Sequence, residues 1–114
     1  MKLTAGAEAL ERANQAFTVA ATAATTGARV SLWLTGEAAW LAVPGRAEAL
    51  DLPYAVPLAE LRAVVLDSGT LTVCTQCAAR RELTEADLVP GARIAGAAVF
   101  VEEALAGGAQ ALVY

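Results

Sequence analysis

The feature that most constrains the fold is a regular alternation of short apolar runs with longer segments of helical periodicity. Apolar residues recur every three or four positions from Ala7 to Thr26, and the run from Arg29 to Leu34 that follows has strand length. Gly and Pro separate successive segments along the whole chain. The resulting order, β-α-β-α-α-β-α-β-α-β, predicts an α/β protein, a three-layer α/β/α sandwich with a mainly parallel five-stranded sheet.

The same pattern places the individual elements. The predicted strands cover residues 1–4, 29–34, 70–73, 92–95 and 111–114, and the predicted helices begin near residues 7, 37, 58, 77 and 97. Three of the four prolines lie between Pro44 and Pro57, which predicts a long irregular connection there. Thr84 and Asp87 have the spacing of a capping box and open a further turn.

The apolar composition favours self-association. The chain has 114 residues, which fits a single domain over residues 1–114. Apolar residues make up 57% of it, and a domain near this size buries only roughly two thirds of the surface that its unfolded chain exposes. Because apolar surface then remains outside, we expect a homo-oligomer whose subunit interface covers it.

Charge and residue usage exclude several classes of function. The net charge is −4, there is no basic run, and Phe, Trp and Tyr occur twice each. Binding to nucleic acid through a basic face is therefore not expected. The chain contains no histidine, which excludes Ser-His-Asp or Cys-His catalysis and a His-ligated zinc. Nothing in the sequence suggests a resident cofactor.

No segment of the chain has the properties of a membrane or export signal. None reaches the roughly 20 apolar residues that span a bilayer, and the start lacks the layout of a signal peptide. We therefore expect a cytoplasmic protein with no membrane partner. In such a reducing compartment, the two cysteines are better interpreted as reactive thiols or metal ligands than as a structural disulfide.

The segment with the clearest chemistry is Cys74-Thr75-Gln76-Cys77, directly after the predicted strand 70–73. A thiol between a strand and a following helix faces the positive end of that helix, which favours thiolate. Arg80 and Arg81 follow within two turns and add positive potential. Cys77 is close enough in sequence to resolve a mixed species or to form a disulfide with Cys74.

Other interpretations of the two cysteines stay open. Cys is often buried, so the pair is also consistent with two small core residues. A zinc site needs two further ligands, which only another subunit can supply, so no metal site is predicted within one chain. A thioredoxin-like motif normally follows an early strand, whereas this pair lies two thirds of the way along the chain.

The run from Val73 to Ala92 resembles the DsrE/DsrF-like (YchN-like) sulfur-relay superfamily. The family's pattern is a strand, a cysteine, a short helix with Arg-Gly, an acidic turn and a Pro-Gly step; Cys74 and Arg81 occupy the cysteine and arginine positions. Residues 30–37 resemble the family's second strand and the loop after it. This sequence departs from the pattern at Glu82, which stands where the family usually has glycine.

The resemblance implies a flavodoxin-like fold that assembles as a trimer or hexamer. It also implies that Cys74 accepts sulfane sulfur as a persulfide and passes it on, so that the expected partners are a sulfur donor and a sulfur acceptor protein. Cys77 corresponds to the second cysteine of the family's Cys-x-x-Cys branch, and Arg81 to the arginine of its Arg-Gly pair.

Arg81 and Glu37 are the candidate substrate-binding residues. Arg81 is placed to steer an anionic substrate toward the thiol. Glu37 follows the strand at 29–34 and could face the same cleft, although the simpler interpretation is a solvated carboxylate at a helix start. Trp33 and Trp40 are interpreted as core or interface residues.

Three functions therefore remain in view. The first is a sulfur carrier or sulfurtransferase in which Cys74 is the acceptor. The second is a non-enzymatic oligomeric binding module in which both cysteines are structural. The third is a dithiol/disulfide redox switch.

Overall fold

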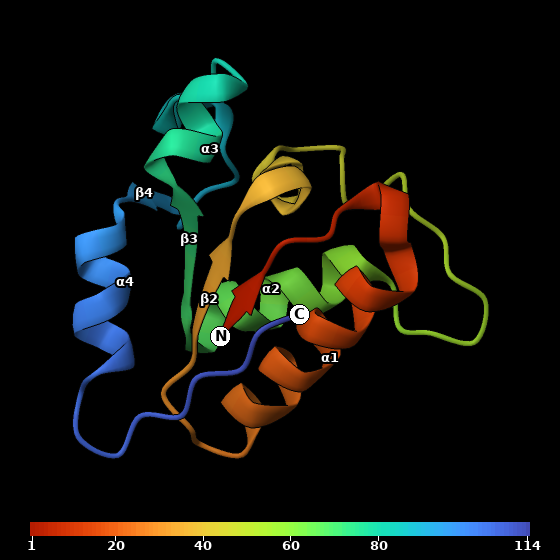
Figure 1. Ribbon diagram of the computed structural model, residues 1–114. Helices are drawn as coiled ribbons and strands as arrows, with labels where there is room; N and C mark the ends of the chain where they lie inside the picture. The colour runs from red at the N-terminus through yellow and green to blue at the C-terminus, as the bar shows by residue number, and fades with distance from the viewer.

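The core of the molecule is a parallel sheet of four strands (Figure 1). The computed structural model describes all 114 residues. The strands are β1 (Lys2–Leu3), β2 (Ser31–Leu34), β3 (Thr70–Cys74) and β4 (Arg93–Ala95). They lie in the order of the sequence, and every neighbouring pair is parallel. The α/β class and the parallel sheet agree with the prediction, but the order differs from the 2-1-3-4-5 order of flavodoxin.

The predicted fifth strand is wrong. The last residues run beside β1, where Val113 forms one isolated parallel bridge with Lys2. Backbone bonds join Lys2 N to the Leu112 carbonyl at 2.8 Å and Tyr114 N to the Lys2 carbonyl at 2.9 Å. A third bond joins Thr4 N to the Tyr114 carbonyl at 3.0 Å, so these last residues lie along the outer edge of β1 as a short attached segment and not as a strand of the sheet.

The helices occupy the connections between the strands. They are η1 (Ala7–Ala9) and α1 (Leu10–Thr25) after β1, η2 (Gly36–Ala42) and α2 (Leu58–Ser68) after β2, α3 (Thr75–Arg80) and η3 (Glu85–Asp87) after β3, and α4 (Ala97–Ala104) after β4. Gly27, with a φ of 91°, follows the end of α1. The capping box of Thr84 and Asp87 is confirmed at η3.

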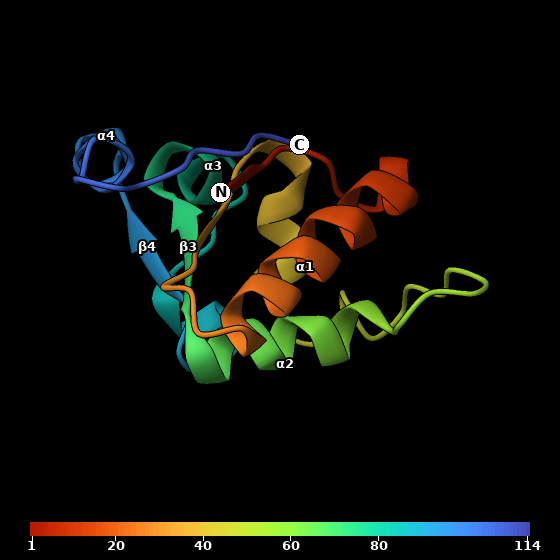
Figure 2. The same cartoon turned by 90° about the horizontal axis from the view of Figure 1, so that it is seen from below.

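One face of the sheet carries the apolar core. Leu3, Leu32, Leu34, Leu71 and Val73 are fully buried there, and alternate residues of these strands point the other way. Figure 2 shows α1 and α2 together on this side. The buried face of α1 is mostly alanine, and small side chains let a helix approach its neighbours closely.

The opposite face is polar and is covered by α4 (Figure 2). Glu103 of α4 accepts hydrogen bonds from Ser31 Oγ at 2.7 Å and from the Trp33 indole nitrogen at 2.8 Å. Its other oxygen pairs with Arg93 at 2.6 Å, and Arg93 Nε also donates to Thr72 Oγ1. Glu103 therefore holds α4 on the sheet by charge-assisted hydrogen bonds where the first face uses apolar packing.

The same contacts change the pKa of the Glu103 carboxyl. Burial raises the pKa of its carboxyl, but the Ser31 hydroxyl, the Trp33 indole and the Arg93 guanidinium outweigh burial and lower that pKa below its ordinary value. A carboxyl whose pKa is lower in the folded state stabilises the fold above its unfolded pKa, near 4.3. That stabilisation is lost as the pH falls through the folded pKa.

We predict that Glu103→Gln destabilises the protein by about 2 kcal/mol at neutral pH, because it removes charged hydrogen bonds to three partners. The difference from the wild type should shrink as the pH falls through the lowered pKa of Glu103. Urea unfolding between about pH 7 and pH 3 measures both effects. Glu102→Gln, at an exposed neighbour on the same helix, is the control, and a loss that is equal at every pH would contradict the assignment.

None of the helices combines the length and the apolar composition that crossing a bilayer requires.

Candidate functional site

The two cysteines lie where the strands end at the carboxyl edge of the sheet. Cys74 is the last residue of β3 and immediately precedes α3, and it pairs with Ala95 at the end of β4. Cys74 is half-buried, Cys77 is buried, and neither forms a disulfide. Parallel α/β sheets bind ligands at this edge, because the connecting loops and helix starts converge there. The strand-end position of Cys74 thus agrees with the sequence prediction.

The surroundings of Cys74 favour its thiolate. Burial raises the pKa of this thiol, but hydrogen bonds from the Cys77 backbone, the Cys77 thiol and the Gln76 backbone, together with the charge of Arg80, lower it overall. Three of these four contributions come from the first turn of α3. The sequence pattern anticipates this arrangement, since a thiol that caps a helix faces free backbone N–H groups.

Cys77 is held by the first residue of η2, which follows the neighbouring strand β2. Its Sγ accepts a hydrogen bond from the backbone N–H of Gly36 at 3.1 Å. Gly36 has a φ of 54°, and a Cβ at this position would lie 3.1 Å from the carbonyl oxygen of Thr4. The backbone can therefore reach the sulfur in this way because residue 36 is glycine.

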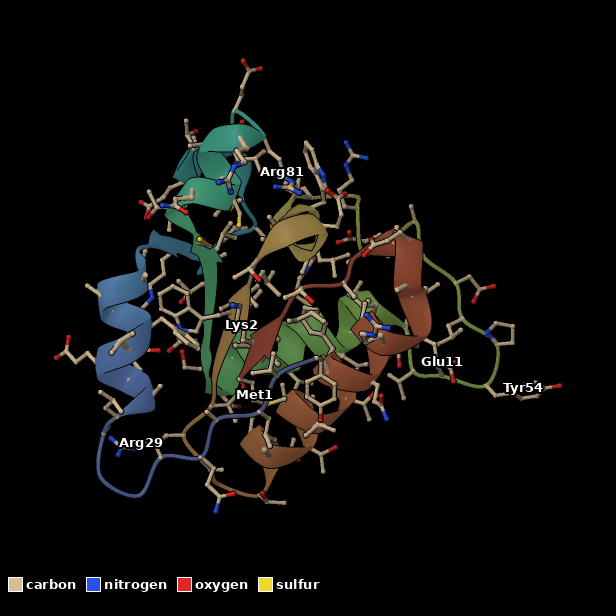
Figure 3. All side chains as sticks on the ribbon, viewed as in Figure 1. Met1, Lys2, Glu11, Arg29, Tyr54 and Arg81 are labelled. Atoms are coloured by element: carbon tan, nitrogen blue, oxygen red, sulfur yellow. The ribbon has the colours of Figure 1, made fainter.

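The side chains of Arg81 and Glu37 lie close together, and they pair with each other. Arg81 Nη2 and Glu37 Oε1 form an ion pair of 2.5 Å, and Arg81 Nη1 donates to the Cys77 carbonyl at 3.1 Å. The Arg81 side chain is 14% exposed and that of Glu37 54%. Arg81, labelled in Figure 3, therefore joins the end of α3 to the start of η2.

The remaining contacts of Arg81 leave one donor unused. Its guanidinium lies 5.9 Å from the centre of the Trp40 ring, and its buried Nε has no hydrogen-bond partner. A second guanidinium, that of Arg46, lies 4.8 Å from the same ring. Of the two places expected for Trp40, the core is wrong, because its side chain is half-buried and lies between two cations at the side of the site.

The departure from the family's Arg-Gly pair has a structural consequence. Glu82 adopts a φ of 55°, in the left-handed region that glycine enters without strain. Its side chain is exposed. The backbone therefore keeps the shape that glycine suits, although the residue itself is not glycine.

Sequence reasoning missed Gly36 as a contact of Cys77. A glycine directly after a strand at the carboxyl edge is the only available signal, and it identifies a tight turn without showing which group the turn reaches. The partnership of Arg81 with Glu37 was also not anticipated, since 44 residues separate them in the sequence.

We predict that Glu82→Gly stabilises the protein by about 0.5–1 kcal/mol, because relief of the left-handed strain exceeds the extra entropy that glycine gives the unfolded chain. Glu82→Ala is the matched control. It removes the same charge but keeps a Cβ, so its stability should not rise. Chemical denaturation of the three proteins is the measurement, and equal gains in both variants would show that charge, and not backbone conformation, is responsible.

Comparison with known proteins gives a consistent result. The model of the DsrE/DsrF-like family matches residues 3–112. No curated protein sequence matches the chain. Among solved structures, the crystal structure of the YchN protein from E. coli is similar, with a TM-score of 0.70 and 11% sequence identity, over 99% of this chain and 96% of that one. At this identity the likeness shows the fold alone.

Proposed function

Because the chain belongs to the DsrE/DsrF-like family, we propose that it is a sulfur-relay protein that accepts sulfane sulfur as a persulfide on Cys74 and passes it to a partner. The proposal rests on the surroundings of Cys74. The thiol ends a strand at the carboxyl edge of the sheet, is half-buried, and has its pKa lowered by the start of α3 and by Arg80. A thiolate is the form that attacks sulfur.

The sulfur transfer is redox-neutral, so it needs no external oxidant or reductant. The Cys74 thiolate attacks the outer sulfur of a donor persulfide, the bond between the two donor sulfurs breaks, and the donor leaves as a thiolate. Cys74 then carries the outer sulfur as its own persulfide. An acceptor thiolate attacks that outer sulfur in turn, and Cys74 leaves as the thiolate; the low pKa of Cys74 favours this step, because a more acidic thiol leaves faster.

Cys77 supports the reactive thiol in this scheme. Its backbone N–H and its thiol both lower the pKa of Cys74, and its own sulfur is fixed by Gly36. It also provides a side reaction. The Cys77 thiolate attacks the inner sulfur of a Cys74 persulfide, a Cys74–Cys77 disulfide forms, and hydrosulfide leaves. A dithiol reductant then restores both thiols at the expense of its own oxidation to a disulfide.

We predict that treatment with a low-molecular-weight persulfide, such as cysteine persulfide, adds one sulfur atom to the protein. Cys74→Ser should abolish the gain, whereas Cys77→Ser should retain it, since the buried sulfur supports the site without receiving the atom. Mass spectrometry of the intact, non-reduced proteins measures this. An added sulfur that survives in Cys74→Ser would remove Cys74 as the acceptor.

We further predict that alkylation of Cys74 by iodoacetamide has a midpoint below the ordinary cysteine value of about 8.5. Cys77→Ala should raise that midpoint, because one hydrogen-bond donor is lost, and Arg80→Gln should raise it by removing a nearby positive charge. Arg12→Gln, at an exposed arginine of α1, is the control. The rate is followed at Cys74 by peptide mass spectrometry. A midpoint at the ordinary value would instead favour a binding module with structural cysteines.

The partner expected first is a second copy of the chain. The large apolar side chains that remain exposed form two groups. The first group lies on and just after α4 and on the C-terminal segment, and consists of Val101, Leu105, Leu112 and Val113. The second group lies on the loop before α2, and consists of Tyr54 and Val56. The helix α4 and the loop before α2 lie at opposite sides of the molecule, and the C-terminal segment runs from α4 to the outer edge of β1 (Figures 1 and 3). Contacts between unlike surfaces form a closed ring when the rotation between copies closes, as a trimer or hexamer requires.

We predict that Leu105→Glu, at a side chain that is 80% exposed, converts the assembly to monomers without changing the fold. Ala106→Glu, at the adjacent exposed residue, adds the same charge and is the control. Sedimentation velocity gives the mass and circular dichroism the folding. A wild-type protein that sediments as a monomer would refute the assembly.

A further inference from the structure

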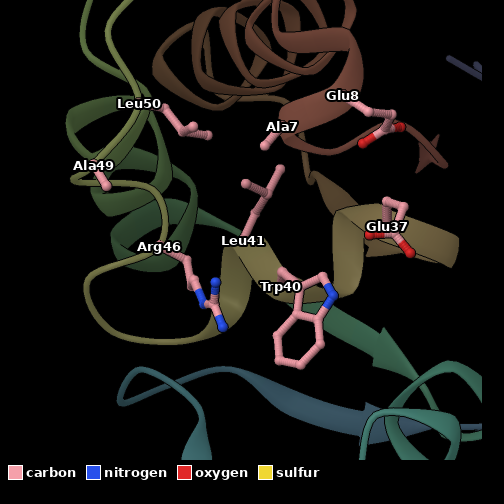
Figure 4. A pocket seen from close by; sticks show the side chains of 8 residues that line it. All are labelled: Ala7, Glu8, Glu37, Trp40, Leu41, Arg46, Ala49 and Leu50. Atoms are coloured by element: carbon pink, nitrogen blue, oxygen red, sulfur yellow. The ribbon is translucent and has the colours of Figure 1, made fainter.

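A cavity beside the cysteine site has no part in the proposed sulfur transfer. It lies between η2, the start of η1 and the loop that follows η2 (Figure 4), and its volume is about 430 Å³. Pockets of roughly 300–1,000 Å³ are the usual size for small-molecule ligands. Eight residues line it: Ala7, Glu8, Glu37, Trp40, Leu41, Arg46, Ala49 and Leu50.

The cavity has an apolar floor and a polar rim. Figure 4 shows Leu41 rising between Leu50 and Trp40, with Ala7 opposite. Arg46 lies on one side of Trp40, while Glu37 and Glu8 lie on the other side. A ligand for this cavity must therefore combine an apolar part with a group that suits one of the two rims.

The acidic rim is already satisfied within the protein. Glu37 is paired with Arg81 at 2.5 Å. Both carboxylate oxygens of Glu8 lie 3.0 Å from the backbone nitrogen of Gly6, whose N–H they accept. Arg81 therefore offsets the charge of Glu37, and the Gly6 N–H holds the carboxylate of Glu8 at the start of η1.

Arg46, in contrast, has no ion-pair partner within the protein. Its guanidinium stacks 4.8 Å from the centre of the Trp40 ring, and it takes part in none of the ion pairs of the structure, which use Arg62, Arg81 and Arg93. The face of the Trp40 ring attracts the positive charge of the guanidinium. It does not accept the hydrogen bonds that the guanidinium N–H groups donate within their own plane. Those donors have the fork geometry that matches a carboxylate.

We propose that this cavity binds a small organic carboxylate with an apolar body. The carboxylate pairs with the guanidinium of Arg46 at the rim, and the apolar body lies over Leu50 and Ala7. Trp40 fixes the plane of the guanidinium and covers one side of the ligand. An inorganic anion would satisfy Arg46 but would leave the apolar floor wet, so it should bind more weakly.

This assignment is independent of the sulfur chemistry. It uses no atom of Cys74 or Cys77, so a chain whose cysteines are replaced should keep the site. Failure of persulfide loading on Cys74 would leave it intact, and failure of carboxylate binding would leave the relay proposal intact.

The test observes the two tryptophan indole N–H signals by ¹⁵N NMR while 4-phenylbutanoate is added. The Trp40 signal, assigned through Trp40→Phe, should shift with a Kd in the millimolar range, as a ligand of this size allows. The Trp33 indole is bonded to Glu103 on the far face of the sheet, so its signal is the internal control. The cation 4-phenylbutylamine and inorganic phosphate are the comparison probes.

Variants separate the role of Arg46 from general charge. Arg46→Gln should weaken 4-phenylbutanoate binding at least tenfold, and Arg46→Lys should give an intermediate loss, because it keeps the charge but not the fork. Arg29→Gln, at an exposed arginine far from the cavity (Figure 3), should leave binding unchanged. Circular dichroism verifies the fold of each. Equal binding of the amine, equal binding of phosphate, or unchanged binding in Arg46→Gln would each overturn the proposal.

Discussion

The parallel pairing of β2 with β3 is the constraint on which the rest of the site depends. Leu34 is level with Val73 in this register, so the residues that follow the two strands begin at the same height. Gly36 therefore lies beside the first turn of α3 and donates its backbone N–H to Cys77 Sγ. A slip of one residue would turn every side chain of one strand to the other face and would separate this donor from its sulfur.

Different interactions hold the helices on the two faces of the sheet. The face under α1 and α2 excludes water over a continuous apolar core, which stabilises the fold without directional contacts. The face under α4 combines an edge-to-face contact between Phe100 and Trp33 with one carboxylate that has three donors, and the bonds of that carboxylate are directional and sensitive to pH. This division leaves the outer apolar side chains of α4 exposed, so the second layer is also the layer available for contacts between copies of the chain.

The sequence determines the position of Cys74 well but the partners of the neighbouring charges poorly. Cys74 was placed correctly, because a strand-length run ends at it and the helix start follows directly. The predicted fifth strand was wrong in a way that periodicity does not show: the segment 111–114 has a strand pattern and lies along β1, but it pairs there through one isolated bridge with Lys2. Arg81 and Glu37 were each predicted near the site, but their ion pair was not predicted, because it joins the end of α3 to the start of η2 and no local pattern relates these two positions.

Glu37 links the cysteine site to the cavity at the far side of η2. Its carboxylate lines the cavity, and through its pair with Arg81 it also holds the guanidinium that donates to the Cys77 carbonyl. Trp40 is common to both as well, since Arg81 and Arg46 lie within 5.9 Å and 4.8 Å of its ring centre. A negative charge bound at Arg46, as proposed, would lie next to the pair of Glu37 with Arg81. The two sites therefore adjoin at Glu37 and Trp40, while neither cysteine lines the cavity.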